Sequence, residues 1–305
     1  MAFDELQLVE WLRRRQHPSG RAPSVALGIG DDMAVIAARA ELVLVSSDML
    51  LDGVHFDLAR HDPSFVGRKA VACSLSDCAA MAVRPIAITV SVALPKSLDR
   101  KTVEQIFEGM FTLADEFDVP LVGGDTTRWD HPLVLDVAIT AVPHDGVDPV
   151  TRSGAKPGDT LFVTGKLGGS LARRHLTFTP RVKEAEAIAR CLGGRLHAMI
   201  DISDGLSLDL WRVCEASGVG AVLDERLLQD VVSHDAQVAS EQDGNPALGH
   251  VLSDGEDFEL LLAVNGPVDA PDISLFEIGR VTDGGLTIRK DDGSTAPLKP
   301  RGFVH

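Results

Sequence analysis

The chain has 305 residues, 45% of them hydrophobic and 24% charged, which is ordinary for a globular protein but too long for one small core. Its 45 acidic residues outnumber its 29 lysines and arginines, so the formal net charge is −16 at pH 7. A surface of that charge repels nucleic acid and anionic lipid, and we expect neither as a partner.

The cysteines and the N-terminus indicate a soluble, cytoplasmic protein. The sequence contains no CxxC pair, which argues against a zinc site, and the cysteine spacing suggests no disulfide framework. The first residues carry acids and lack a continuous apolar stretch, so they do not resemble a signal peptide. No segment approaches the roughly 20 apolar residues that cross a bilayer.

The first half predicts an alternation of helices and strands. Its elements are a helix over 4–15, strands over 41–46, 85–94 and 133–142, and helices over about 63–82 and 98–117. The stretch 143–159, PHDGVDPVTRSGAKPGD, is dense in proline, glycine and aspartate and predicts a junction. We therefore expect two domains, 1–145 and 146–305.

The second half predicts a similar mixture. Its elements are strands over 160–164, up to about 200, and over 220–223, 258–264 and 276–281, with helices over 181–192 and about 206–216. Because both halves mix helices and strands, the expected fold class is α/β, or α+β mixed.

Aspartate recurs where apolar, strand-like stretches end in small residues. The sequence reads LGIGDD at 27–32, LVLVSSD at 42–48, LVGGD at 121–125 and MIDISDG at 199–205. An aspartate in this place often makes a turn or caps a helix, and Asp204 could cap the helix beginning near Leu206.

Asp77 fits that explanation poorly, because it lies within a helical pattern, CSLSDCAAM at 73–81. Its apolar neighbours predict a buried carboxylate, and an unpaired buried charge costs several kcal/mol. A bound metal ion would remove that cost. Carboxylate and hydroxyl ligands without histidine or cysteine favour Mg²⁺, which would also neutralise nucleotide phosphates.

The chain has no GxxxxGK[ST], HRD or DFG motif, which excludes P-loop enzymes and protein kinases.

On these motifs the chain resembles the thiamine-monophosphate kinases, within the superfamily that includes aminoimidazole-ribotide synthetase. The matching blocks, in the family's order, are GIGDDMAVI (28–36), SSDMLLDGVHF (46–56), KAVACSLSDCAAM (69–81), LVGGDTTR (121–128), VTRSGAKPGDTLFVTG (150–165), IDISDGL (200–206), LSDGEDFELL (252–261) and KPRGFVH (299–305). They span nearly the whole chain.

The resemblance implies a homodimer formed through the sheet of the N-terminal domain, a C-terminal α/β domain, and an active site in the cleft between them. It implies transfer of the γ-phosphoryl group of ATP to thiamine monophosphate, giving thiamine diphosphate, with several Mg²⁺ ions. The Mg²⁺ ligands carried over by motif position are Asp32, Ser46, Ser47, Asp48, Asp77, Asp125, Asp201 and Asp204. Gly124, Asp125, Arg152 and Ser203 would contact ATP, and His55, Glu256 and Phe303 would line the thiamine-phosphate side.

No general base is assigned, because the acceptor is already a phosphate oxygen and positioning with charge neutralisation can carry the rate. Without the resemblance, His55 could equally well be a histidine whose hydrogen bonds are made within a turn. Phe303 would be interpreted as a packing residue.

The chain departs from the family's pattern at three places. Met49 stands where threonine is usual, and the chain reads Asp254-Gly255-Glu256-Asp257 where the family usually reads GGED. The segment 165–182 is short and keeps only Pro180 and Arg181 of an RPxPR ending. Two alternatives therefore stay open. The same fold and metal site could act on a different acceptor, or the chain could bind nucleotide without turnover.

Overall fold

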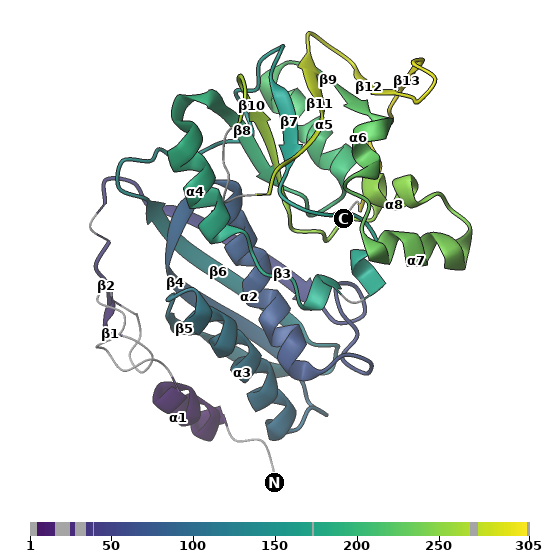
Figure 1. Ribbon diagram of the computed structural model, residues 1–305. Coiled ribbons are helices and arrows are strands. Elements are labelled where there is room, and N and C mark those ends of the chain that lie inside the picture. Colours follow the sequence, from purple (N-terminus) through teal and green to yellow (C-terminus); the bar gives the residue numbers. More distant parts are fainter. Residues whose placement is uncertain are drawn as a thin grey trace. The chain divides into compact units, whose positions relative to one another are not determined.

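The computed structural model describes residues 5–15, 25–27, 35–38, 40–172, 174–268 and 274–303. The chain divides into two compact units. The N-terminal unit comprises Met1–Cys78 and Arg84–Pro143, and the C-terminal unit comprises Ala79–Val83 and His144–His305. Each contains its own sheet and helices, so the expected mixture of α and β structure in two parts is confirmed (Figure 1).

The N-terminal unit is built on a four-stranded sheet with the strand order β3-β6-β4-β5. Its strands are β3 (Leu44–Leu51), β4 (Val83–Pro95), β5 (Leu121–Trp129) and β6 (Val134–Pro143). Strands β3 and β6 run antiparallel, whereas β4 and β5 run parallel. A separate antiparallel pair is formed by β1 (Val25–Leu27) and β2 (Val35–Ile36).

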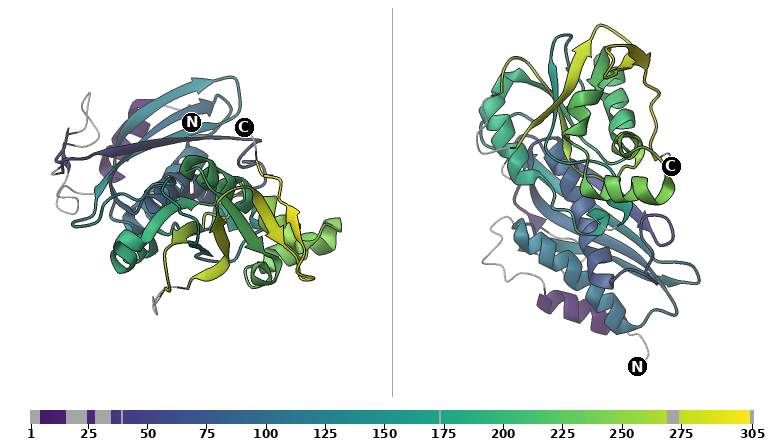
Figure 2. Two further views of the ribbon diagram at one scale, coloured as in Figure 1. Left: turned by 90° about the horizontal axis from the view of Figure 1, so that it is seen from above. Right: turned by 45° about the vertical axis from the view of Figure 1, so that its right-hand side comes forward.

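Two helices, α2 (Pro63–Ala80) and α3 (Arg100–Glu116), lie on one face of this sheet (Figures 1 and 2). They cross at Gly67 and Gly109, where an added Cβ atom would stand 1.8 Å from a carbonyl oxygen of the opposite helix. Only glycine permits so close an approach. Helix α1 (Glu5–Arg15) contacts α3, with Trp11 edge-on to Phe111 at a centroid distance of 6.4 Å.

The C-terminal unit is built on a seven-stranded sheet with the order β13-β12-β9-β11-β7-β10-β8. Its strands are β7 (Thr160–Val163), β8 (Leu196–Asp201), β9 (Gly220–Asp224), β10 (Leu260–Val264), β11 (Phe276–Thr282), β12 (Leu286–Arg289) and β13 (Thr295–Pro297). The pair β12–β9 is parallel and the other pairs are antiparallel.

The helices of this unit are α4 (Val182–Leu192), α5 (Leu206–Ser217), α6 (Glu225–Gln229), α7 (His234–Asp243) and α8 (Ala247–Ser253), with 3-10 turns η1 (Ser170–Ala172), η2 (Arg174–Leu176) and η3 (Gly193–Arg195). Helix α5 contacts β8 and β9 and buries Leu206, Leu210 and Val213 in the core of the unit. Among the described residues, no helix combines the length and the apolar character needed to cross a membrane.

The structure corrects the expectation that the aspartates follow strand ends. Asp48 lies within β3, because the pairing with β6 continues to Leu51, and Asp125 lies within β5. Asp201 does end β8, as expected. Asp204 does not cap α5, because the N-cap residue is Gly205 and no side chain caps this helix.

Candidate functional site

In the N-terminal unit, β3 and α2 bring together three of the predicted metal ligands, Ser46, Asp48 and Asp77. Alternate residues of β3 face α2, so the side chains of Ser46 and Asp48 share one side of the strand. The Ser46 hydroxyl donates to the Asp77 carboxylate, and Ser74 Oγ donates to Asp48 Oδ2 at 2.7 Å. Asp77 lies within α2, as predicted, but it is only partly buried.

The electrostatics of this pair favour a cation. Burial and, to a lesser extent, the charge of Asp77 raise the pKa of Asp48 to about 6, although the hydrogen bond from Ser74 lowers it. A divalent cation would relieve this repulsion, and two carboxylates with adjacent hydroxyls are a donor set that fits Mg²⁺. Within the described ranges no three Asp, Glu, His or Cys side chains form a metal-binding group. The remaining positions around a cation here would fall to water or to substrate oxygens.

Ser47 is not brought to this pair. Its side chain lies on the opposite face of β3, where Oγ donates to Asp136 Oδ1 at 2.7 Å. The Mg²⁺ role of Ser47 stays a prediction, and Asp32 lies outside the described residues.

Gly124 and Asp125 lie on β5, at the opposite edge of the sheet from β3. Strands β6 and β4 lie between β5 and β3 in this sheet. Gly124 has a φ of +152°, and a Cβ atom there would lie 1.8 Å from the Val90 carbonyl oxygen. The close approach of β5 to β4 therefore requires glycine at this position.

His55 lies in the turn that follows β3. Its Nδ1 atom accepts a hydrogen bond from the Leu51 amide at 3.0 Å, and its carbonyl accepts from Lys69 Nζ at 2.6 Å. Lys69 is fully buried in α2. One ring nitrogen of His55 thus accepts a hydrogen bond within the turn. The role of His55 in binding substrate stays a prediction.

In the C-terminal unit, three segments distant in sequence are joined by backbone hydrogen bonds. Glu256 N donates to Ser203 O at 2.6 Å, and Phe303 N donates to Asp204 O at 3.0 Å. Asp201 ends β8 two positions before Ser203 in the same segment. The fold therefore gathers the predicted site residues of this unit around the loop 201–205, with Arg152 excepted.

Two residues that the sequence did not single out hold this loop. Asp209, fully buried in the first turn of α5, accepts from the amides of Asp204 and Gly205 at 3.0 and 3.2 Å. Burial raises its pKa to about 6, against the lowering effect of Arg212. Arg212 contacts both Asp209 Oδ1 at 2.6 Å and Asp204 Oδ2 at 2.5 Å. A metal ion at Asp204 would therefore share this carboxylate with a guanidinium group.

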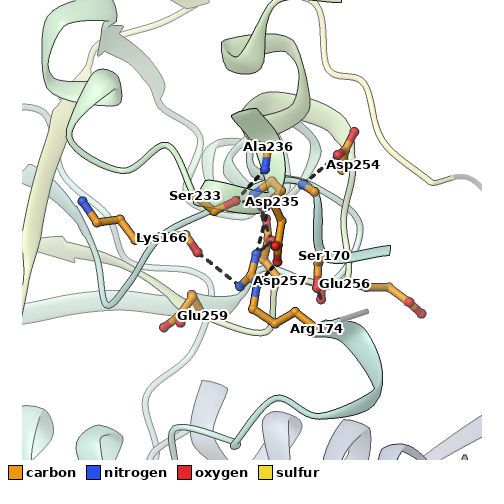
Figure 3. A network of polar contacts seen from close by, with 12 residues as sticks. Lys166, Ser170, Arg174, Ser233, Asp235, Ala236, Asp254, Glu256, Asp257 and Glu259 are labelled. Carbon is orange, nitrogen blue, oxygen red and sulfur yellow. Dashed lines mark hydrogen bonds and ion pairs between the residues drawn. The ribbon is translucent and has the colours of Figure 1, made fainter. Parts of the chain in front are cut away.

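The short segment 165–182 is fixed by a second network (Figure 3). Arg174 Nη2 donates to Asp257 Oδ1 at 2.8 Å, and the Asp257 carboxylate accepts the Gly168 amide at 2.9 Å. Burial raises the pKa of Asp257 to about 7, although Arg174 lowers it. Arg181 makes a bidentate contact with Glu259 at 2.6 and 2.8 Å, which raises the pKa of Arg181.

Arg152 lies in the loop before β7. It is exposed and makes no hydrogen bond or ion pair with the rest of the described chain. Its cationic group is thus available to an anionic ligand.

Comparison with known proteins identifies the family of this chain. The family model for the N-terminal domain of AIR synthase related proteins matches residues 30–143. The thiamine-monophosphate kinase of Rhodopirellula baltica is 38% identical, over 99% of this chain and 97% of its own length. The chain belongs to the thiamine-monophosphate kinase family.

Solved structures of this family have the same fold. The thiamine-monophosphate kinase of Stenotrophomonas maltophilia matches with a TM-score of 0.80 and 31% identity, over 97% of this chain and 99% of that one. AaThiL, complexed with AMPPCP and TMP, matches with a TM-score of 0.76 and 27% identity, over 99% of this chain and 96% of that one. As a member of the thiamine-monophosphate kinases, the chain is a kinase.

Proposed function

We propose that this chain transfers the γ-phosphoryl group of ATP to thiamine monophosphate and forms thiamine diphosphate. The observation that carries the proposal is the pairing of Asp48 with Asp77 across β3 and α2, in a chain matched over its length by thiamine-monophosphate kinases. The complex of the related AaThiL with AMPPCP and TMP supports the choice of both substrates.

The acidic side chains would hold Mg²⁺, which when bound neutralises the charge of the phosphates. In the N-terminal unit the proposed ligands are Asp32, Ser46, Ser47, Asp48, Asp77 and Asp125, and in the C-terminal unit they are Asp201 and Asp204. Gly124, Asp125, Arg152 and Ser203 would contact ATP. Because the acceptor is a phosphate oxygen, positioning replaces a strong base.

Glu256, Phe303 and His55 are proposed to bind thiamine monophosphate. The thiazolium ring of the substrate is a cation, so a carboxylate and an aromatic ring suit it chemically. Phe303 is exposed, and its backbone is joined to Asp204 as that of Glu256 is joined to Ser203.

A homodimer formed through the N-terminal sheet belongs to the same proposal. The face of β3 that carries Ser47 also presents Val45 and Met49, which are 77% and 58% exposed. A second copy of this chain would cover such an apolar strip on an edge strand. Light scattering should give twice the mass of one chain for wild type and a lower mass for V45D. A monomeric wild type would refute the dimer.

A phosphoryl-transfer assay tests the activity. Purified protein with ATP and Mg²⁺ should form thiamine diphosphate from thiamine monophosphate, and no product from thiamine or without an acceptor. If ATP binds and no thiamine diphosphate forms, the proposed activity is wrong.

A further inference from the structure

Glu256 has a backbone that is fixed on both sides. Its amide donates to Ser203 O, and its carbonyl accepts from Ser170 Oγ, each at 2.6 Å. Its φ is +51°, in the left-handed region that residues other than glycine rarely adopt. Backbone strain of this kind persists where surrounding contacts impose it, and it concentrates at functional sites.

The side chain of Glu256 is fixed as well. His175 Nδ1 lies 2.9 Å from Glu256 Oε2, and His175 is buried with 4% of its surface exposed. Figure 3 shows the Glu256 carboxylate directed away from Arg174 and Asp257, so it does not take part in that ion pair. The carboxylate is thereby held in one orientation and keeps part of its surface accessible.

His175 is itself held in place by its neighbour in η2. Arg174 contacts Asp257 and donates to the carbonyls of Gly168 at 3.1 Å and Lys166 at 3.3 Å. These bonds fix the short segment to the loop that carries Glu256 (Figure 3). The segment 165–182 thus supplies the residue that contacts the carboxylate of Glu256.

We propose that His175 is a positioning residue for thiamine monophosphate, acting through the carboxylate of Glu256. The proposal rests on the proposed function, in which Glu256 binds this substrate. A carboxylate that is already oriented loses less side-chain entropy when a cationic ring binds to it. Loss of His175 should therefore weaken binding of thiamine monophosphate and leave ATP binding unchanged.

The test compares two substitutions of similar size in the full chain. Asparagine in H175N places an N–H near the position of Nδ1, whereas glutamine in H175Q places it near Nε2. We expect H175Q to lower kcat/KM for thiamine monophosphate about 10–100-fold, the range for a lost hydrogen bond to a charged group. H175N should stay within about threefold of wild type, and KM for ATP should stay within about threefold in both.

A double-mutant cycle separates positioning from stability. If His175 acts through Glu256, adding H175Q to E256Q should change kcat/KM by less than about threefold. The matched control is H197A, which removes a comparable contact, His197 Nδ1 to Asp159 Oδ2 at 2.9 Å, and should leave KM for thiamine monophosphate unchanged.

Thermal melting checks that each variant is folded. If H175Q does not fold, the positioning role of His175 is tested by the kinetics of E256Q and H175N instead. In that case E256Q must raise KM for thiamine monophosphate and H175N must not. A folded H175Q with wild-type kinetics, or losses from H175Q and E256Q that multiply independently, would overturn the positioning role alone. A wild-type protein that forms no thiamine diphosphate overturns the proposed function, and the positioning role with it.

Discussion

Carboxylates meet different partners in the two units of this molecule. In the N-terminal unit, Asp48 and Asp77 accept hydrogen bonds from serine hydroxyls, and the charge of Asp77 raises the pKa of Asp48. In the C-terminal unit, guanidinium groups contact the buried carboxylates, as Arg174 contacts Asp257 and Arg212 contacts Asp209.

This difference distinguishes carboxylates suited to binding a metal ion from carboxylates that stabilise the fold. A carboxylate paired with arginine has its charge balanced within the protein, and it can fix a loop in place. Two carboxylates close to one another repel, so their arrangement is stable only when a proton or a metal ion neutralises it. The N-terminal pair is therefore the better candidate for a metal ligand, and the C-terminal pairs explain how the site loops keep their shape.

Removing one member of the N-terminal pair should have the largest effect on activity. We expect D77N to lower kcat on the order of 10²–10³-fold, the range for losing one group that stabilises charge in a transition state. Its melting temperature should hold or rise, because the repulsion with Asp48 is removed. Steady-state kinetics at saturating ATP and Mg²⁺, with a thermal melt of the same sample, measure both.

The control for this substitution is D130N, which changes an exposed aspartate paired with Lys96 at 2.8 Å in the same unit. D130N should retain wild-type kcat. Wild-type kcat in D77N would exclude the Asp48–Asp77 pair as the metal site.

Removing an arginine from a C-terminal pair should instead affect stability. R174A leaves the carboxylate of Asp257, which is 1% exposed, without its ion pair, and we expect a loss of about 3 kcal/mol in the free energy of unfolding. The exposed pair of Arg190 with Glu186 is the control, and R190A should cost less than about 0.5 kcal/mol. Urea unfolding monitored by circular dichroism compares the two.

The double variant R174A/D257N should recover part of the loss, because the uncompensated charge is gone. If R174A and R190A lower the free energy of unfolding equally, the buried ion pair of Arg174 contributes no more to stability than the exposed ion pair of Arg190.

Much of the fold was predictable from sequence. The apolar periodicity of α3 placed this helix within a few residues, because its buried face repeats at helical spacing. Helix α2 was placed by its long, mostly apolar run instead, and it is buried on nearly all sides between Ala70 and Ala80. Helix α7 was missed because it is mostly polar and Ala236 is its buried residue. Its cap, Ser233, which accepts from the Ala236 amide at 2.9 Å, is a local signal that could have revealed it.

The site was predictable only in part. The motifs led to Asp48 and Asp77, and strand alternation alone would have separated Ser47 from them. Arg174 and Asp257, 83 positions apart, share no local pattern, because only the tertiary fold brings them together. Arg212 was within reach of sequence reasoning, because it stands one helical turn after Asp209.

The smallest effect we predict is a change in pH dependence at Asp257. Burial raises its pKa from the usual 3.8 to about 7, so the folded chain binds this proton more tightly than the unfolded chain does. Stability contributed by this group is therefore greatest below about pH 4 and declines as the pH rises to about 7. In D257N this decline should be absent, and the difference in melting temperature between pH 5 and pH 8 should shrink by a few degrees, at roughly 2–4 °C per kcal/mol. D235N, which removes a more exposed partner of Arg174 at 3.6 Å, should keep the wild-type difference. If D257N and D235N show the same pH dependence as wild type, Asp257 is ionised throughout this range and Arg174 outweighs its burial.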